Sequence, residues 1–210
     1  MSVRSRCRIA ALVALLLGLS GCANAPWRAA PTPSAEDARW AAHRDAVAAL
    51  ESFTVTGRVA IQRGSEGGGA KLRWRQHGAE SDLRIMAPLA QGSFRLQGDA
   101  GQVVLNAPDG KQYRAASFEG LMAAHLGWSF PVDGARYWVR GIPDPRQPVT
   151  QLSLDAEGRL SDLAQAGWRI SVLEYGSSAS EALPKRLFLN AGDLKIRLAI
   201  DGWELPEGQM

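Results

Sequence analysis

Residue types that can carry catalysis or bind a metal occur singly in this sequence. His43, His77 and His125 have no second ligand at a spacing typical of a metal site, which favours surface or packing roles. Gly64 to Gly69 lacks the lysine of a phosphate-binding loop and leads into a predicted strand. The serines within residues 177–180 lack the elbow motif of a serine hydrolase. We therefore expect no enzyme, no metal site and no cofactor, and a binding protein is the favoured class.

One cysteine stands where acylation chemistry is expected. Three arginines within residues 4–8 precede an apolar run at 9–19, which is the layout of a secretory signal peptide. The run is about half the length of a membrane-spanning helix, which disfavours a transmembrane anchor. Leu19-Ser20-Gly21-Cys22 resembles the bacterial lipobox. The resemblance implies an S-diacylglyceryl lipid on Cys22, removal of residues 1–21 as signal peptide, and N-acylation of the new terminus.

The charge balance changes once the signal peptide is set aside. The chain has 24 basic and 21 acidic residues, and three of the basic ones lie in residues 1–21, which contain no acid. The predicted mature chain is therefore formally neutral, which gives no support to nucleic-acid binding. Cys7 leaves with the signal peptide and Cys22 carries lipid, so no disulfide is expected. Stability must then come from a hydrophobic core, for which the chain is long enough.

Residues 22–34 are predicted to be the lipid anchor and a flexible tether, because this segment contains three prolines and little periodicity. Ala23 follows Cys22 in place of the aspartate that commonly retains lipoproteins in the inner membrane, which indicates the outer membrane. Residues 35–210 are predicted to form the folded domain. Its first element is a helix that Ser34 can cap and whose apolar stripe is Trp40, Val47 and Leu50.

After residue 51 apolar residues alternate with polar ones. This period of two predicts antiparallel strands with one apolar and one solvated face. Turn residues such as Pro108-Asp109-Gly110 separate the runs. We expect close to ten strands in a single meander, with helices at 117–126 and 135–140. The predicted fold class is mainly β with α: an open antiparallel half-barrel whose hydrophobic concavity is covered by short helices.

Landmark residues follow the lipobox in a characteristic order. They are Phe53-x-x-x-Gly57-Arg58-x-Ala60, Trp74, Pro88-Leu89, Tyr137-Trp138-x-x-Gly141-x-Pro143, Gly167-Trp168 with Tyr175, Leu183-Pro184-Lys185-Arg186-Leu187, and Trp203. Their order resembles the LolB family of outer-membrane lipoproteins over essentially the whole predicted mature domain. The resemblance implies a LolA/LolB-like fold, in which an open curved sheet holds an apolar concavity under a helical lid.

The resemblance also implies a function. Such proteins are anchored in the outer membrane, face the periplasm, receive lipoproteins from the chaperone LolA and place them in the inner leaflet of that membrane. The implied partners are a LolA-like chaperone, acylated lipoprotein cargo and outer-membrane phospholipid, and we expect a monomer that binds no nucleic acid. Exposed acyl chains cost about 0.8 kcal/mol per methylene in water, so a carrier needs an apolar cavity.

The expected acyl-chain cavity is lined by inward-facing residues of the sheet and the lid. They are Phe53, Val55, Val59, Trp74, Ile85, Phe94 and Leu96 from the strands, and Met122, Leu126 and Trp138 from the helices. The same side chains would form the core of any curved sheet, so a packed core is the competing interpretation of each.

Pro88, Leu89 and Ala90 form the expected membrane-insertion loop. Leu89 lies between two predicted strands, where a turn is usually polar, and an apolar loop tip can contact a membrane. In the family the corresponding leucine projects from this loop and delivers the lipoprotein into the membrane. Ala90 stands where the family often has glycine, which leaves the loop conformation open. The competing interpretation is a leucine folded back onto the sheet.

Two alternatives to the acceptor function stay open. One is a lipoprotein that binds another lipid or a glycolipid, and the other is a scaffold without transfer, whose concavity its own side chains would fill. Five outward basic residues near one edge are candidates for contact with the chaperone, although solvated faces are commonly charged. They are Arg58, Lys71, Arg73, Arg75 and Arg84.

Overall fold

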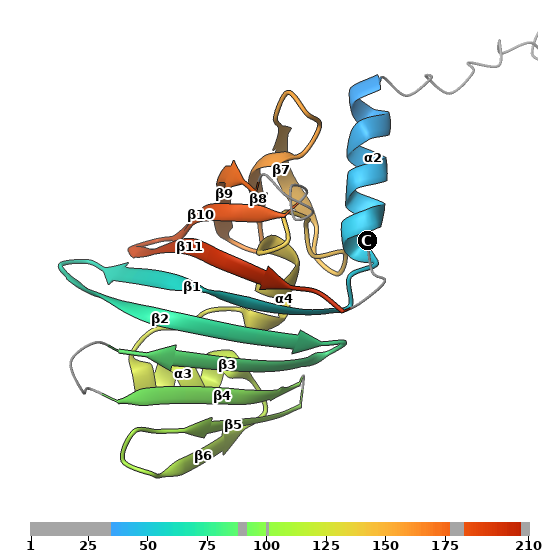
Figure 1. Ribbon diagram of the computed structural model, residues 1–210. Coiled ribbons are helices and arrows are strands. Elements are labelled where there is room, and N and C mark those ends of the chain that lie inside the picture. Colours follow the sequence, from blue (N-terminus) through green and yellow to red (C-terminus); the bar gives the residue numbers. More distant parts are fainter. Residues whose placement is uncertain (1–34, 88–91, 100, 177–182, 207–210) are drawn as a thin grey trace, which may run out of the picture. The chain divides into compact units, whose positions relative to one another are not determined.

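The computed structural model describes residues 35–87, 92–99, 101–176 and 183–206 (Figure 1). These residues belong to one compact unit, Ser34–Met210. Its elements, in chain order, are α2 (Ala35–Ala48), β1 (Ser52–Arg63), β2 (Glu66–His77), β3 (Glu80–Met86), β4 (Ser93–Asp99), β5 (Gln102–Asn106), β6 (Gln112–Ala115), α3 (Phe118–Leu126), α4 (Val132–Trp138), β7 (Val149–Leu154), β8 (Leu160–Gln165), β9 (Trp168–Tyr175), β10 (Pro184–Ala191) and β11 (Leu194–Glu204).

The described strands form one open sheet. Eleven strands lie in the order β6-β5-β4-β3-β2-β1-β11-β10-β9-β8-β7, and all neighbours are antiparallel. The predicted mainly β fold with short helices is confirmed, but the predicted single meander is wrong. β1 to β6 and β7 to β11 are two meanders, which the pairing of β1 with β11 joins. The chain leaves β6 at one edge and enters β7 at the other, and α3 and α4 lie on the connection between them (Figure 1).

Two of the described strands were not predicted from the sequence, and the reasons are local. β6 is short and contains a single large apolar residue, Tyr113. In β8 the apolar residues Leu160 and Leu163 are three apart, which breaks the period of two, and the register with β7 shifts near this point. A β-bulge of this kind interrupts the period of two, so a search for alternating apolar residues does not detect the strand.

Alternation along the strands separates the two faces of the sheet. In β2, Leu72, Trp74 and Gln76 are buried, while Lys71 and Arg75 are exposed. The five basic residues expected near one edge lie on β1, β2 and β3, which are central in the described sheet, so that placement is wrong. The reason is the long-range pairing of β1 with β11, which continues the sheet beyond β1.

The two predicted helices between β6 and β7 are present, one of them displaced. The hydroxyl oxygen of Ser117 accepts a hydrogen bond from the Gly120 amide at 3.2 Å and caps α3, which ends at Gly127 with φ 75°. α4 spans Val132–Trp138 in place of the predicted 135–140. It begins after Pro131 with Asp133 in its first turn, and Gly141 with φ 79° turns the chain away beyond it.

The predicted first helix is present as α2, and it packs on a small apolar cluster of its own. Val47 and Leu50 are buried there with Ile142 and Leu183. The Arg140 guanidinium lies beneath the end of α2 and donates hydrogen bonds to the carbonyl oxygens of Val47 at 3.0 Å and Leu50 at 2.6 Å. Within the part of the chain that the structure describes, no helix is long and apolar enough to cross a membrane.

Candidate functional site

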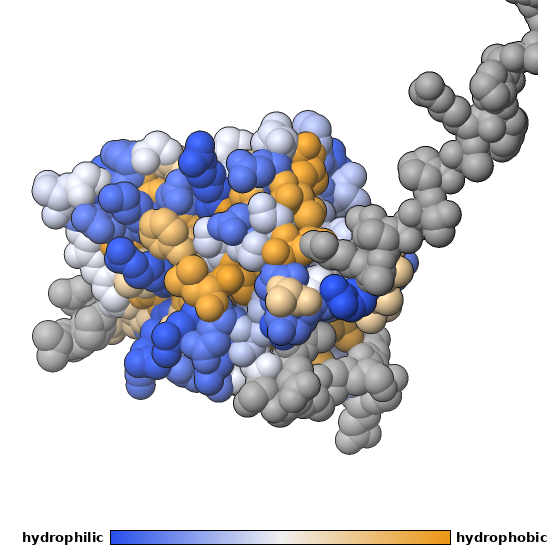
Figure 2. Space-filling view, turned by 90° about the horizontal axis from the view of Figure 1, so that it is seen from above, coloured by the Kyte–Doolittle hydropathy of each residue, from blue (hydrophilic) through white to orange (hydrophobic). Residues whose placement is uncertain are grey.

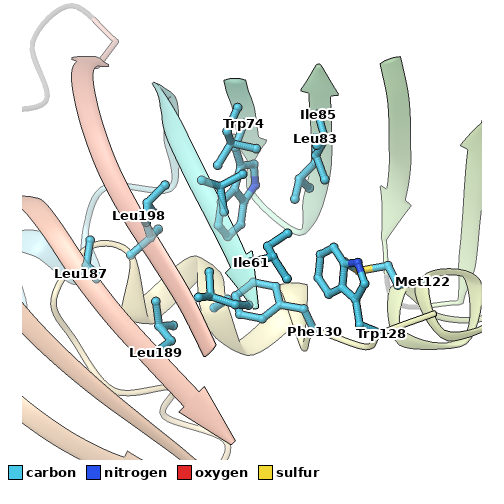
Figure 3. Close-up of a pocket in the computed structure, with 15 residues that line it drawn as sticks. Ile61, Trp74, Leu83, Ile85, Met122, Trp128, Phe130, Leu187, Leu189 and Leu198 are labelled. Atoms are coloured by element: carbon cyan, nitrogen blue, oxygen red, sulfur yellow. The ribbon is translucent and has the colours of Figure 1, made fainter. Parts of the chain in front are cut away.

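An apolar cavity lies between the sheet and the helical segment (Figure 3). It is lined from β1, β2, β3, β10 and β11 on one side, and from α3, α4 and the segment between them on the other. All lining residues are apolar: Val59, Ile61, Leu72, Trp74, Leu83, Ile85, Met122, Trp128, Phe130, Ala135, Val139, Leu187, Leu189, Ile196 and Leu198. The free volume is about 50 Å³. A cavity of this kind can hold an apolar ligand. The hydrogen-bonding side-chain groups among its lining residues are two indole N–H groups, those of Trp74, which donates to Gln76, and Trp128.

Trp74 is fixed at the cavity wall by a buried polar cluster. Its indole N–H donates to the side-chain oxygen of Gln76 at 3.0 Å, and the Ser81 hydroxyl donates to the same oxygen at 2.6 Å. Gln76 and Ser81 are 2 % and 0 % exposed, so these bonds satisfy polar groups that have no access to water. Phe53 packs edge-on against Trp74, with the ring centroids 6.0 Å apart. The indole therefore presents its apolar surface to the cavity in one orientation.

Aromatic residues close the helical side of the cavity. Trp128 and Phe130 come from the segment between α3 and α4, and Phe130 packs edge-on against Trp168 with the centroids 5.3 Å apart. Trp138 is fully buried beside them, and its indole N–H donates to the side-chain oxygen of Gln165 at 2.8 Å. That bond anchors α4 to the end of β8, so α4 forms a fixed wall.

A second, more open hollow continues from the cavity. The two share Ile61, Ile85 and Trp128. The remaining lining of the hollow is Arg63, Glu66, Gly67, Gly68, Gly69, Ala70, Phe94, His125, Leu126 and Gly127. Gly68 pairs with Ile61 in the β1–β2 register and shares its inward face, and a Cβ atom added at Gly68 would have no heavy atom within 4 Å. The glycine run thus leaves open space in the hollow at Gly68.

A hydrogen bond and an aromatic stack hold α3 at the edge of this hollow. The Arg63 guanidinium donates a hydrogen bond to the carbonyl oxygen of Gly127, at the end of α3. His125 stacks on Tyr113 of β6, with the ring centroids 3.8 Å apart. α3 is therefore tied to the β1–β2 hairpin on one side and to the sheet edge on the other.

The structure divides the predicted cavity residues into three groups. Val59, Trp74, Ile85 and Met122 line the cavity. Phe94 and Leu126 line only the hollow. Phe53, Val55, Leu96 and Trp138 are buried in the core and line neither space. Whether any of them contacts lipid remains a prediction.

Several lining residues were missed by sequence reasoning. Leu187, Leu189, Ile196 and Leu198 alternate as clearly as the strands that were chosen. Their position beside β1 depends on a pairing that alternation alone does not reveal. Trp128 and Phe130 lie outside any helix or strand, and two aromatic residues so close together in a connection were the available signal.

Cys22 and the loop residues Pro88, Leu89 and Ala90 lie outside the described residues. The described chain on both sides of that loop is closely spaced, since the Ala87 amide donates to the carbonyl oxygen of Gly92 at 3.2 Å. The lipid on Cys22 and the role of the loop therefore remain predictions.

The histidines occupy three separate environments. His77 hydrogen-bonds to the Ser52 hydroxyl at 2.9 Å, His125 stacks on Tyr113, and His43 packs near Trp40 and Tyr175. Among the described residues, no three His, Cys, Asp or Glu side chains are grouped so that they could hold a metal ion.

The architecture places the chain in a known structural class. A LolA superfamily protein from Nitrosomonas europaea superposes with a TM-score of 0.51 at 9% identity, over 80% of this chain and 93% of that chain. A DUF1329 family protein from Desulfovibrio piger superposes with a TM-score of 0.50 at 9% identity, over 81% and 93%. At these identities the likeness shows the fold alone, so the chain shares its fold class with these two proteins.

The sequence then identifies the family within this class. Residues 51–203 match the family model for the outer membrane lipoprotein LolB. A protein named outer-membrane lipoprotein LolB from Nitrosococcus oceani is 40% identical over 200 residues, which are 95% of this chain and 98% of that protein. A protein of the same name from Stutzerimonas stutzeri is 37% identical over 191 residues, 90% and 92% of the two. The chain therefore belongs to the outer-membrane lipoprotein LolB family, a family of lipoprotein localisation factors.

Proposed function

We propose that this protein accepts lipoproteins from a LolA-like periplasmic chaperone by binding their acyl chains, and inserts them into the inner leaflet of the outer membrane. The observation that carries the proposal is the cavity with its entirely apolar lining. An acyl chain leaving one carrier must not cross water, because each exposed methylene costs about 0.8 kcal/mol. Transfer needs no nucleotide where the acceptor cavity binds the chain more tightly than the chaperone does.

Acyl binding requires the cavity to enlarge. A free volume of about 50 Å³ has room for only a few water molecules. The segment carrying Trp128 and Phe130 forms no strand or helix and closes the cavity from the side of the hollow. We expect this segment to move outward, with the acyl chain entering past Gly68.

The remaining parts of the proposal concern attachment to the membrane. Cys22 carries the lipid that anchors the mature chain in the outer membrane, and the folded unit faces the periplasm. Residues 22–34 act as a tether, and Leu89 enters the bilayer during delivery. The protein acts as a monomer on outer-membrane phospholipid.

The small free volume favours one competing function. A scaffold that transfers nothing would need no space beneath its helices, and 50 Å³ is close to a filled core. A carrier of another lipid would need the same enlargement of the cavity but would accept no cargo from the chaperone. Cargo transfer separates the three functions.

The test uses a chain beginning at Ala23, which retains every described helix and strand. It is mixed with LolA loaded with a labelled lipoprotein, and the label is followed by co-purification. Movement of the label to this protein without nucleotide is the expected result. Retention on LolA, while the same preparation supplies a known LolB acceptor, would contradict the proposal.

The Gly68→Trp variant tests the route of entry. An indole at this position occupies the open side of the hollow and blocks the path of an acyl chain, so we expect label uptake to slow by about tenfold. Gln62→Trp is the matched control, because Gln62 is exposed, follows Ile61 in β1 and faces the opposite side of the sheet. Equal uptake by both variants would exclude entry past Gly68.

The Leu89→Glu variant separates uptake from delivery. A carboxylate is unfavourable in a bilayer, so we expect unchanged uptake from LolA and about tenfold less insertion into vesicles or more. Leu89→Met is the control that keeps an apolar tip. Insertion by Leu89→Glu at the rate of the unchanged chain would remove Leu89 from the mechanism.

A further inference from the structure

The face of the sheet opposite the helices carries a groove, here called the basic groove. Its lining is Arg58, Val59, Ala60, Gly69, Ala70, Lys71, Met86, Ala87, Leu173, Arg186, Leu187, Arg197, Leu198 and Ala199. Four of these residues are basic and none is acidic. This face of the sheet is turned to the viewer in Figure 1, and Figure 2 shows the unit from above, where apolar residues lie among hydrophilic ones.

Strand register explains why these residues converge. Met86 pairs with Lys71, Lys71 with Arg58, and Arg58 with Ala199. Ala199 pairs in turn with Arg186. The outward side chains of five neighbouring strands therefore stand in one row. Ala60, Gly69 and Ala199 are small, so they form the floor of the groove between longer neighbours.

Two of the four basic residues in the groove are paired with carboxylates of the described chain, and two are not. Arg58 pairs with Asp201 at 3.0 Å and Arg186 with Glu174 at 3.0 Å. Within the described ranges, Lys71 and Arg197 have no carboxylate oxygen at salt-bridge distance, and Arg197 lies over the ring of Phe188 at 5.5 Å. These two basic groups are therefore available to form ion pairs with phosphate groups.

An exposed leucine lies at the rim of this positive surface. Leu173 is 66% exposed, against 42% for Val149, the other large apolar residue described as exposed. Alternation along β9 turns Leu173 outward, since Ile170 and Val172 are buried, and the β9–β10 register passes from Glu174 to Val172 without pairing Leu173. An apolar tip beside basic residues is the combination that binds the interface of an anionic bilayer.

We propose that the basic groove binds the surface of an anionic phospholipid bilayer, with Lys71 and Arg197 at the headgroup phosphates and Leu173 among the acyl chains. An acidic protein surface would match the charge but would leave Leu173 without an apolar partner, so the bilayer is the better fit. This contact is additional to the proposed acyl transfer, which uses the opposite face of the sheet.

The experiment measures vesicle binding by the chain beginning at Ala23, which lacks the lipid of its own anchor. Vesicles of phosphatidylcholine alone are compared with vesicles that also contain phosphatidylglycerol, by co-sedimentation at low and high salt. We expect binding to the anionic vesicles only, weakened by salt. Lys71→Glu with Arg197→Glu lowers the partition coefficient by about tenfold or more.

Matched variants keep the test specific. Arg114→Glu with Arg169→Glu makes the same charge change at exposed residues outside the groove, and we expect no more than about a twofold loss. Leu173→Ser should lower binding to anionic vesicles at high salt as well as at low salt, because its contribution is apolar.

Equal losses from the two charge-reversed pairs would overturn the proposal, because net charge alone would explain them. Failure of the unchanged chain to bind anionic vesicles at low salt would also overturn it. If the groove variant then took up less cargo from LolA than the control pair, the groove would be a site for an acidic protein. Vesicle binding by a chain that accepts no cargo would instead refute the proposed function and leave this inference intact.

Discussion

At the scale of single residues, His43 is a titratable side chain of α2 that packs near two aromatic rings. Its ring lies 6.1 Å from that of Trp40 and 6.2 Å from that of Tyr175, and its Nε2 atom is buried with no hydrogen-bond partner among the described residues. Burial lowers the pKa of His43 below its ordinary value of 6.5, and the positive charge of Arg159 lowers it further against the opposing effect of Asp155.

This environment predicts a pH-dependent stability. The unfolded chain binds a proton at His43 before the folded chain does, so the free energy of unfolding falls as pH drops below about 6.5. His43→Phe keeps the aromatic packing and removes the titration. Urea unfolding at pH about 7.5 and about 5.5 should show a smaller pH-dependent loss in the variant than in the unchanged chain. Equal losses would assign the pH dependence to other groups.

At the scale of elements, the attachment of α2 depends on Arg140. The guanidinium is 4% exposed, and burial lowers its pKa to about 10. Its partners are carbonyl oxygens at the end of α2 and the rings of Phe53 and Tyr137, at 5.7 and 5.2 Å. The positive charge thus lies at the negative end of the helix, where it is stabilised.

Arg140→Met should loosen α2 more than the rest of the unit. The variant keeps the apolar stem but leaves the buried carbonyl group of Leu50 without its donor and that of Val47 with the Leu50 amide alone, which costs about 1–3 kcal/mol of stability. Urea unfolding measures the loss, and hydrogen exchange should show it first in the amides of α2. Arg44→Met is the control on the same helix, because its pair with Asp45 is exposed and contributes about 0–1 kcal/mol. Equal losses in both variants would contradict the anchoring role.

At the scale of the whole folded unit, the seam between β1 and β11 joins the two meanders. Its register shifts between Thr56 and Gly57, which brings the Gly57 backbone against the carbonyl group of Ala199. A Cβ atom at Gly57 would overlap that carbonyl oxygen. The close approach of the two strands therefore requires glycine.

Gly57→Ala should destabilise the entire unit. The clash involves backbone on both sides and forces the seam to shift, at a cost of about 1–3 kcal/mol. Gly68→Ala is the control in the neighbouring strand, where the added methyl group meets open space. Thermal unfolding of the two variants measures the difference. A melting temperature of Gly57→Ala equal to that of the control would show that the seam adapts without cost.

Alternation and turn chemistry were sufficient to predict most of the strands, both helices between β6 and β7, and the inward faces. These are local properties, since the period of two depends only on neighbouring residues. Val59, Trp74, Ile85 and Met122 were assigned to the cavity on this basis and do line it. Strand β8 was missed because a bulge interrupts its alternation.

The amino-acid sequence by itself determined the fold class, the inward and outward faces of its strands, and the family, because each is carried by local periodicity or by the order of landmark residues. Only the tertiary structure decided which faces meet. The β1–β11 pairing joins residues more than a hundred positions apart and brings Leu187 and Leu198 beside Val59. The same pairing aligns Lys71, Arg58 and Arg186 across the outer face. Such long-range register depends on the packing of the complete sheet, which no local pattern encodes.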